Sequence, residues 1–312
     1  MKNKVLVIMG PTAVGKTALG IQLAKKYNGE VINGDSLQVY RKLDIGTAKV
    51  TEEEMNGVPH HLIDIVDMTE PFTASDFKVA AEQVIEGIQK RNKLPILVGG
   101  SGLYIQGLLE NMQFGNTGED VAYRQQLEAE LVATGSKELW EKLAAIDSKA
   151  AANIHPNNSR RVIRALEAIH VSGTKFSEQE VIRDEQKYDS LLIALDSDRT
   201  LLYDRINQRV DHMVEAGLIE EARMLYEEPK GLESQAIKGI GYKEWIPYFE
   251  GNQSREEVIE QIKQNSRRYA KRQLTWFRNR MKDVHWFDSK EIDYLANVEK
   301  VVDSFFEKDQ TK

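Results

Sequence analysis

The stretch Gly10-Pro11-Thr12-Ala13-Val14-Gly15-Lys16-Thr17 decides the fold. It has the pattern G-x-x-x-x-G-K-[ST], in which a glycine-rich loop surrounds a phosphate group. An apolar, β-branched run at residues 5–9 precedes it and predicts a buried parallel strand. Residues 18–26 follow it and predict a helix with an apolar face. Strand, loop and helix in this order are the context that the motif requires.

The loop has the chemistry of an anion site. A glycine-rich turn at a helix start points several backbone N–H groups at one place, and the helix dipole adds positive potential there. Lys16 adds a full charge, and Thr17 offers a hydroxyl to Mg²⁺. A nucleoside triphosphate is the usual occupant, but any diphosphate presents the same oxygens. An ordinary tight turn is the alternative, although chance should produce the pattern in only about one chain of this length in a hundred.

Composition sets outer bounds on the function. The chain has 312 residues, of which 41% are hydrophobic and 29% charged, as in a soluble protein with one large domain or two modest ones. It has no cysteine, which excludes disulfides, thiolate metal sites and a cysteine nucleophile. The net charge of −7 argues against a nucleic-acid partner for the chain as a whole.

The sequence also carries expectations about location. Residues 1–4 lead directly into the first predicted strand, which leaves no room for a signal peptide. No apolar run approaches the length of a membrane span. We therefore expect a cytoplasmic protein with no membrane partner, and we expect a monomer.

Further apolar runs predict the rest of a parallel sheet. Residues 30–36, 94–98 and 191–196 are typical of buried strands, and residues 73–91 form an amphipathic helix pattern. Between residues 115 and 187 the strand signals stop and amphipathic helices dominate. We predict an α/β fold with a P-loop NTPase-like parallel sheet core, residues 1–114 and 188–312, flanked by helices, and a helical insertion domain, residues 115–187.

Polar residues follow two of the predicted strands. Asp35 ends one of them and should lie near the phosphate loop, because ligands gather at the carboxyl ends of strands in open α/β sheets. It could act as a base or as a Mg²⁺ partner, and helix capping or turn formation is the alternative. The strand at 94–98 continues as Gly99-Gly100-Ser101-Gly102, without the aspartate of a Walker-B strand. This disfavours an ordinary ATPase or GTPase, and the glycines suggest close approach of the backbone to a ligand.

Two histidines stand side by side at His60 and His61. Neighbouring residues point to opposite faces of a strand, and no second histidine follows at helical spacing. We expect structural hydrogen bonds here rather than a metal site.

Arginines recur at helical spacing. Arg160 and Arg164 share one face of a predicted helix, with Arg161 beside them, although this can also be a solvated face. Arg205 and Arg209 follow the last predicted strand and suit a lid that clamps phosphate. Small P-loop kinases use such a lid, so these two residues fit a kinase as well.

A basic segment at residues 261–282 contrasts with the acidic chain. It has eight cations and no acidic residue, with aromatic residues interleaved. This is typical of a polyanion-binding surface, and a solvated helix face is the alternative. One stripe at helical spacing comprises Lys263, Arg267, Lys271, Leu274 and Arg278.

Several of these segments, in order along most of the chain, resemble the bacterial tRNA dimethylallyltransferases (tRNA isopentenyltransferases). The P-loop is shared with many proteins, whereas Asp35-Ser36-Leu37-Gln38-Val39-Tyr40 and Lys271-Arg272-Gln273-Leu274-Thr275-Trp276-Phe277 are far more specific. Segments 44–49, 59–64, 99–104, 160–167 and 238–242 add to the resemblance. Where the family often has threonine, Ser101 keeps a hydroxyl.

The resemblance implies transfer of a dimethylallyl group from dimethylallyl diphosphate to N6 of the adenosine just 3′ of the anticodon, with Mg²⁺ as cofactor. Asp35, Lys16 and Thr17 would be catalytic, with Thr17 on the metal. Residues 10–17 and Arg209 would bind the diphosphate. The residues expected to bind the anticodon arm of tRNA are Asp35, Ser36, Leu37, Gln38, Ser101, Arg124, Ser159, Arg160, Arg161, Arg164, Lys271, Arg272 and Trp276.

Two other functions stay open at this point. A P-loop kinase of a small metabolite would use the arginine lid, but it leaves the basic segment and residues 35–40 unexplained. A nucleotide-switched RNA-binding protein would want a base-recognition motif such as Asn-Lys-x-Asp, which the sequence lacks.

Overall fold

The computed structural model describes residues 3–112, 120–178 and 187–307. The chain divides into two compact units, a core unit of Met1–Asn111 with Asp184–Lys312, and a helical unit of Met112–Arg183. The predicted domain boundary between 114 and 115 lies outside the described residues, and the one between 187 and 188 falls where description resumes.

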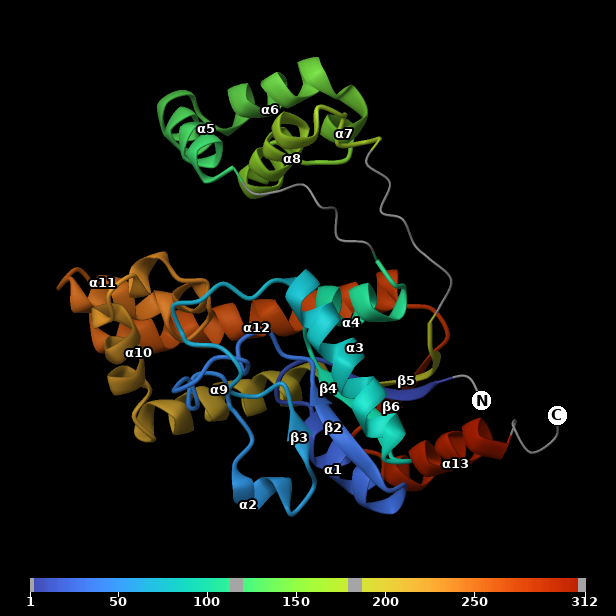
Figure 1. The fold of residues 1–312 in the computed structure, drawn as a ribbon. Coiled ribbons are helices and arrows are strands. Elements are labelled where there is room, and N and C mark those ends of the chain that lie inside the picture. Colours follow the sequence, from blue (N-terminus) through green and yellow to red (C-terminus); the bar gives the residue numbers. More distant parts are fainter. Residues whose placement is uncertain (1–2, 113–119, 179–186, 308–312) are drawn as a thin grey trace. The chain divides into compact units, whose positions relative to one another are not determined.

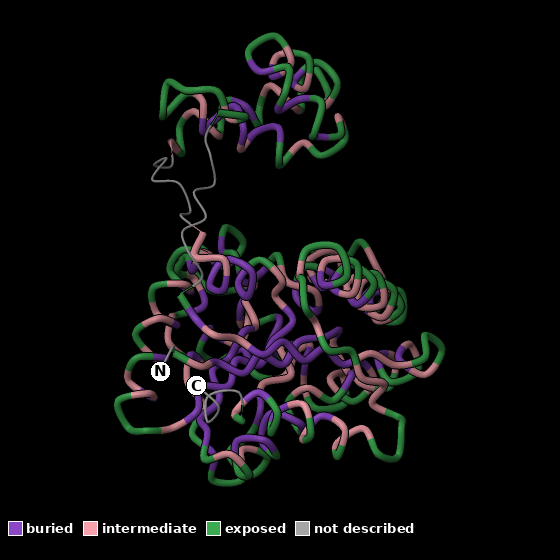
Figure 2. Tube along the Cα trace, turned by 90° about the vertical axis from the view of Figure 1, so that its right-hand side faces the viewer, coloured by how far each residue is buried: buried purple, intermediate pink, exposed green. Residues whose placement is uncertain are grey.

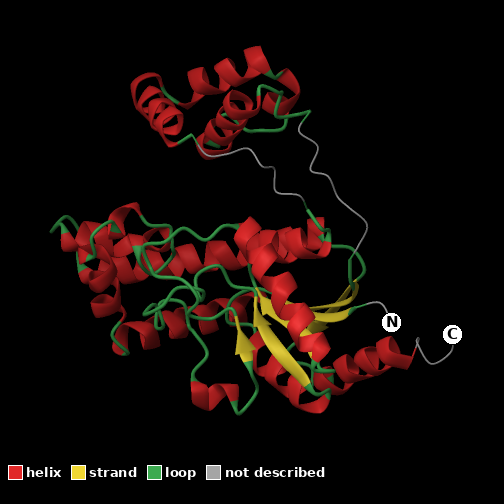
Figure 3. Cartoon of the chain, viewed as in Figure 1, coloured by secondary structure: helices red, strands yellow, loops and turns green. Residues whose placement is uncertain are grey.

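The core unit is built on a six-stranded parallel sheet (Figure 3). Its strand order is β3-β2-β4-β1-β5-β6, which confirms the predicted parallel α/β fold. The strands are β1 Lys4–Met9, β2 Gly29–Asn33, β3 His60–His61, β4 Leu94–Gly99, β5 Asp189–Asp196 and β6 Val284–Asp288. The apolar runs of the sequence predict the four central strands but not β6, which lies at the edge and leaves His285 and Trp286 exposed.

Helices cover both faces of this sheet (Figure 1). In the core unit they are α1 Lys16–Lys26, α2 Glu52–Met55, α3 Ala74–Lys90, α4 Gly102–Leu109, α9 Arg199–Glu215, α10 Leu218–Glu227, α11 Ile246–Phe249, α12 Arg255–Arg280 and α13 Tyr294–Glu307. Three short 3₁₀ turns, η1 Gly231–Glu233, η2 Ala236–Lys238 and η3 Lys243–Trp245, follow α10. Helix α3 begins after Thr73, whose hydroxyl accepts a hydrogen bond from the backbone N–H of Asp76.

Side-chain alternation along the strands supplies two cores. Val5, Val7 and Met9 of β1 pack in one apolar cluster with α3 and α4. Leu6 and Ile8 pack in a second cluster with α1, α9 and α13. Successive residues of a strand point to opposite faces, so a strand buried on both sides must be apolar throughout. Figure 2 shows the buried residues gathered in the interior of the core unit.

The helical unit has its own apolar cluster. It consists of α5 Val121–Thr134, α6 Ser136–Ile146, α7 Ser148–Ala152 and α8 Ser159–Ser172. Leu127, Leu139, Leu143 and Leu166 are buried together, as the amphipathic pattern predicts. Among the described residues of both units, no helix is at once long and apolar enough to cross a membrane.

A buried carboxylate fastens the edge of the sheet. Glu30 of β2 is only 3% exposed, and its oxygens lie 2.7 Å from His61 Nε2, 2.6 Å from Arg91 Nη2 and 3.0 Å from Lys93 Nζ. Desolvation acts to raise the pKa of Glu30, but the hydrogen bonds from Arg91, His61 and Lys93 prevail and lower it to about 2. The structural role expected for His61 is what the structure shows.

We expect Glu30→Gln to lower the free energy of unfolding at pH 7 by about 2 kcal/mol, because three donors lose a buried charge. The folded-state pKa lies below the unfolded one, so this stability is present above pH 4–5 and is lost as the pH falls towards about 2. Urea unfolding of both proteins across this range measures the difference. Glu86→Gln on α3, whose partner is Lys90, is the exposed control and should change little. A constant difference down to pH 2 would contradict the account.

Candidate active site

The loop after β1 is held in an anion-binding shape by its glycines. Gly15 has φ 104° and precedes the first residue of α1, Lys16. Gly10 has φ 151°, and a Cβ there would stand 2.6 Å from the carbonyl oxygen of Leu195. L-residues with a side chain rarely adopt such a φ, so the motif glycines are required by backbone geometry. The start of α1 then points its free N–H groups into the loop.

Two cations lie at this loop. Lys16 Nζ donates to the carbonyl of Pro11 at 2.7 Å, and Arg209 Nη1 of α9 donates to Thr12 Oγ1 at 3.2 Å. Burial lowers the pKa of Lys16 to about 8; Asp35 opposes this shift and Arg209 adds to it. Burial also lowers the pKa of Arg209, but a guanidinium starts from so high a value that it stays charged. An anion bound here would therefore meet two partly desolvated positive charges.

Asp35 stabilises a turn after β2 and also lies at the site. Oδ1 of Asp35 accepts a hydrogen bond from the backbone N–H of Leu37 at 2.9 Å. The backbone N–H of Asp35 donates to Asn33 Oδ1 at 3.0 Å. The turn-forming role that the sequence left open is therefore present. Burial raises the pKa of Asp35, although the N–H of Leu37 and the charge of Lys16 act against it. A carboxylate with a raised pKa is a stronger base than an exposed aspartate.

Two neighbouring cavities meet at these residues. The small chamber, of about 100 Å³, is lined by Lys16, Thr17, Gln38 and His60 among others. The large chamber, of about 360 Å³, has apolar walls from Leu37, Ile206, Val210, Met213, Ile240 and Ile262. Both are lined by Thr12, Asp35, Thr47, Ala48, Arg209 and Tyr269.

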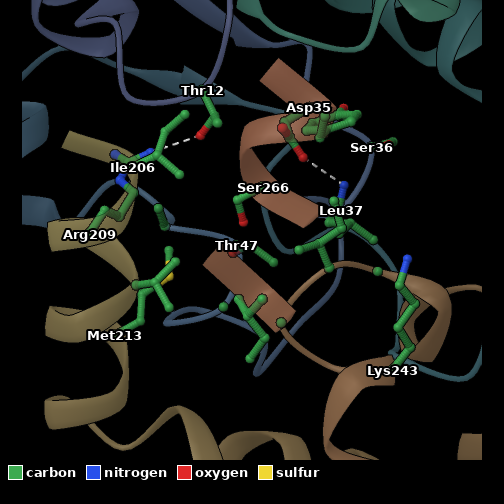
Figure 4. Close-up of a pocket in the computed structure, with 18 of the residues that line it drawn as sticks. Thr12, Asp35, Ser36, Leu37, Thr47, Ile206, Arg209, Met213, Lys243 and Ser266 are labelled. Carbon is green, nitrogen blue, oxygen red and sulfur yellow. Dashed lines mark hydrogen bonds between the residues drawn. The ribbon is translucent and has the colours of Figure 1, made fainter. Parts of the chain in front are cut away.

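The large chamber is bounded from several elements (Figure 4). Arg209 and Met213 reach into it from α9, while Asp35 and Leu37 come from the segment after β2. Arg205, which the sequence paired with Arg209 as a clamp, is exposed and lines neither chamber. Only one arginine of the predicted lid is thus placed to meet a phosphate.

A buried glutamine joins the P-loop to the basic helix. Gln273 of α12 is 5% exposed; its Oε1 accepts the Thr12 N–H at 3.0 Å and its Nε2 donates to the Gly100 carbonyl at 3.0 Å. The sequence alone predicts no role for this residue. The pattern that indicates its place is helical spacing: Gln273 lies three residues after Ala270 and four before Phe277. All three residues are therefore on the buried, inner face of the helix.

The glycines after β4 make room for protein groups. A Cβ at Gly99 would stand 2.3 Å from the carbonyl oxygen of Gly34, and one at Gly100 would stand 2.1 Å from Gln273 Nε2. At Gly102 the obstacle is the Trp276 ring, 2.3 Å away. The sequence suggested that a ligand approaches this backbone. Gly99 and Gly100 do line the small chamber, but the space above all three glycines is filled by the chain itself.

With this geometry established, comparison with known proteins identifies the family. A family model described as IPP transferase matches residues 38–280. This chain belongs to the IPP transferase family.

Relatives extend the match over nearly the whole length, P-loop included. The tRNA dimethylallyltransferase of Halalkalibacterium halodurans is 52% identical over 304 residues, 96% of each chain. That of Geobacillus thermodenitrificans is 53% identical over 300 residues, covering 95% of this chain and 94% of the relative. The resemblance inferred from the motifs is therefore confirmed.

Solved structures agree. The full-length tRNA isopentenylpyrophosphate transferase from Bacillus halodurans superimposes with a TM-score of 0.75 at 48% identity, covering 99% of both chains. A eukaryotic dimethylallyltransferase acting on tRNA gives a TM-score of 0.80 at 35% identity, over 98% of this chain and 80% of the other.

In this IPP transferase family member, the polar residues after β2 and β4 come together. The backbone N–H of Ser36 donates to Ser101 Oγ at 3.0 Å, and Leu37 lines the large chamber. Gln38 lines the small chamber and donates to the carbonyl of Thr47 at 3.1 Å. The four predicted positions thus surround one end of the sheet, beside Asp35.

The predicted tRNA-binding residues of the helical unit are placed within that unit only. Ser159 begins α8, and Arg160 and Arg161 follow it. Arg124 Nη2 lies 2.9 Å from Oε1 of the buried Glu167, and Arg164 Nη1 lies 3.1 Å from its Oε2. Arg124 and Arg164 therefore also have a structural role, as counter-charges to a buried carboxylate.

The cations of the basic helix α12 fall into two groups, those paired with neighbouring elements and those exposed at the surface. Lys263 lies 2.7 Å from Asp211 of α9, Arg267 donates to Asn207, and Arg278 pairs with Asp196. These three members of the predicted stripe hold α12 against α9 and the end of β5. The exposed cations of the segment are Arg268, Lys271, Arg272, Arg278, Arg280 and Lys282, and of these Arg278 is paired with Asp196. Trp276 is half-buried beneath Arg280, whose guanidinium lies 5.5 Å from its ring centre.

We expect Gln273→Leu to lower the free energy of unfolding by about 1–3 kcal/mol, because the Thr12 N–H and the Gly100 carbonyl lose their partners. Inorganic diphosphate should also bind more weakly, since the loop loses the support that fixes Thr12. Urea unfolding and calorimetric titration measure the two effects. Gln264→Leu, an exposed change on the same helix, should leave both unaltered. Equal behaviour of the two variants would show that the bonds of Gln273 do not matter.

Proposed function

We propose that this chain transfers a dimethylallyl group from dimethylallyl diphosphate to N6 of the adenosine just 3′ of the anticodon in tRNA, and releases diphosphate. The observation that carries the proposal is the position of Asp35, which lines both chambers. A donor diphosphate in the small chamber and a target base in the large one would meet beside this carboxylate. The relatives, which are named tRNA dimethylallyltransferases, support the same reaction.

The small chamber suits a diphosphate. Lys16, Thr17 and Arg209 line it together with the end of β4, which lacks a Walker-B aspartate. As the allylic C–O bond breaks, its electron pair goes to the diphosphate, which gains charge. Lys16, Arg209 and the loop N–H groups would stabilise that charge from fixed positions, so little reorganisation is needed.

Magnesium fits the chemistry of the small chamber. No group of three or more His, Cys, Asp or Glu that could hold a metal occurs in the described parts of the chain. Mg²⁺ at phosphate sites is usually held by substrate oxygens, water and one or two protein groups. We propose Thr17 as the protein ligand. The ion would neutralise part of the diphosphate charge.

The large chamber suits a base taken out of its stack. Its walls are largely apolar, and Ser36, Tyr269 and Arg272 add polar groups. N6 attacks the allylic carbon, a C–N bond forms, and Asp35 accepts the proton that N6 releases. The adenine must leave its stack to reach Asp35, as in other base-modifying enzymes. We propose that Ser36, Leu37, Gln38 and Ser101 contact the target nucleotide.

The remaining tRNA contacts would come from cations. We propose that exposed Lys271 and Arg272 on α12, with Trp276, hold the anticodon arm through phosphates and stacking. Arg124, Ser159, Arg160, Arg161 and Arg164 are our candidates in the helical unit. We propose that the protein acts as a monomer in the cytoplasm.

The test of the function is direct. Purified protein is incubated with tRNA transcripts, Mg²⁺ and radiolabelled dimethylallyl diphosphate, and label in the RNA is counted. A parallel tube holds γ-labelled ATP and no prenyl donor. We expect label in RNA, lost when the adenosine 3′ of the anticodon is replaced and lost in Lys16→Ala. ATP consumption with no RNA labelling would instead favour a small-molecule kinase.

We expect Asp35→Asn to reduce turnover by about 10²–10⁴-fold, because the amide still accepts the Leu37 N–H but cannot take a proton. Binding of diphosphate and of tRNA should be nearly unchanged. In the unaltered protein, activity should fall as the pH drops through the raised pKa of Asp35, since only the ionised base works. Asp67→Asn, an exposed pair partner of Arg41, is the control. Preserved turnover in Asp35→Asn would rule out its role as base.

We expect replacement of Arg268, Lys271 and Arg272 by glutamine to weaken tRNA binding and to flatten its salt dependence. Each lost phosphate contact should reduce the slope of log K against log salt by roughly 0.7–0.9. Filter binding between 50 and 300 mM salt measures the slope.

The matched control for that triple variant removes the same charge elsewhere. Exposed lysines of α1, α3 and the segment after β6 serve for this, namely Lys25, Lys90 and Lys290. If both triple variants change the slope equally, net charge rather than the α12 surface governs tRNA binding.

A further inference from the structure

His60 has a buried nitrogen with nothing to bind. Its Nδ1 lies 2.8 Å from the Val58 carbonyl oxygen, which can only accept, so Nδ1 carries the proton. Burial lowers the pKa of His60, which keeps the ring neutral. Nε2 is therefore an acceptor with a lone pair, and it is buried without a hydrogen-bond partner in the part of the chain that the structure describes. Such an atom calls for an explanation.

The strand sets the direction of this side chain. His60 of β3 stands opposite Val31 of β2 in the sheet. The side chain of the next residue, His61, forms a hydrogen bond with Glu30. Because neighbours on a strand point to opposite faces, one histidine is structural and the other lines the small chamber.

Because Nε2 is an acceptor, its partner in the occupied site must be a hydrogen-bond donor. The small chamber also holds Lys16, Thr17 and Arg209, which suit a phosphate oxygen. A diphosphate ester bound to Mg²⁺ is ionised at neutral pH and presents only acceptors, so it cannot satisfy another acceptor. A water molecule polarised by a bound cation is a strong donor, and Mg²⁺ at phosphate sites keeps several waters.

We propose that His60 Nε2 accepts a hydrogen bond from a water ligand of the Mg²⁺–diphosphate complex, and so positions the hydrated ion without binding it directly. The inference rests on the proposed function in one respect, the diphosphate occupant of the small chamber. His60 is then a positioning residue that acts through water. The ring orientation is fixed in advance by the Val58 carbonyl.

The test measures binding rather than catalysis. Calorimetric titration of the full-length protein with inorganic diphosphate is done in EDTA and at Mg²⁺ concentrations from 0.01 to 10 mM. We expect His60→Leu to bind diphosphate normally in EDTA but to need roughly 10–100-fold more Mg²⁺ for the tight complex. His60→Gln, whose amide oxygen can accept the same bond, should recover most of the loss. Tm and circular dichroism establish that each variant is folded, and His60→Ala replaces the leucine variant if that one is not.

Each other outcome overturns the proposal. An unchanged Mg²⁺ requirement in His60→Leu would show that the ion does not use this nitrogen. An equal loss in EDTA would show that His60 contacts the diphosphate itself or supports the loop. His61→Gln is the matched control and should lower Tm through Glu30 without altering the Mg²⁺ requirement. Prenyl transfer to RNA is assayed separately, so a failure here is distinct from a failure of the proposed function.

Discussion

The close approach of two backbones is the constraint on which the site depends. Gly34 after β2 and Gly99 at the end of β4 stand so near that a side chain on Gly99 has no space. This contact lets the Gly34 carbonyl accept the Ser101 N–H at 3.2 Å, and it brings Ser36 under the Ser101 hydroxyl. Asp35 is the residue between, so its position follows from the approach of the strands rather than from its own interactions alone. A bulkier residue at Gly99 would separate the strands and move the carboxylate away from the P-loop.

Charge is concentrated where these elements meet. Lys16 and Arg209 are far apart in the sequence, yet both lie at the P-loop and act on the pKa of Asp35. Partial burial strengthens every interaction among them, because a low local dielectric screens charge poorly. The same burial that weakens the proton affinity of Lys16 raises that of Asp35. Burial at this end of the sheet thus produces both an anion-binding site, at Lys16 and Arg209, and a stronger base, at Asp35.

Much of this could be predicted from sequence, and the failures have physical causes. The P-loop, the four central strands and the place of Asp35 near the P-loop follow from motifs and apolar runs. Strand β6 is short and half-exposed, so its pattern carries little signal. Helical spacing places Gln273 on the buried face of α12, but its bonds to Thr12 and Gly100 join segments far apart in the sequence, which no local pattern encodes. The stripe on α12 looked uniform in sequence, but Lys263 and Arg267 face α9 because packing, not spacing, decides which cations stay free.

The two faces of helix α12 make different contacts. Its inner face holds Gln273 against the Thr12 amide, and its outer face exposes Lys271 and Arg272. A ligand on the outer face and a ligand in the loop would therefore both act on the same helix. By thermodynamic reciprocity, the free energy that one occupant gains from the other must be the same in both directions. A single rod with a glutamine on one side and cations on the other is thus the physical connection between the P-loop and the exposed basic surface.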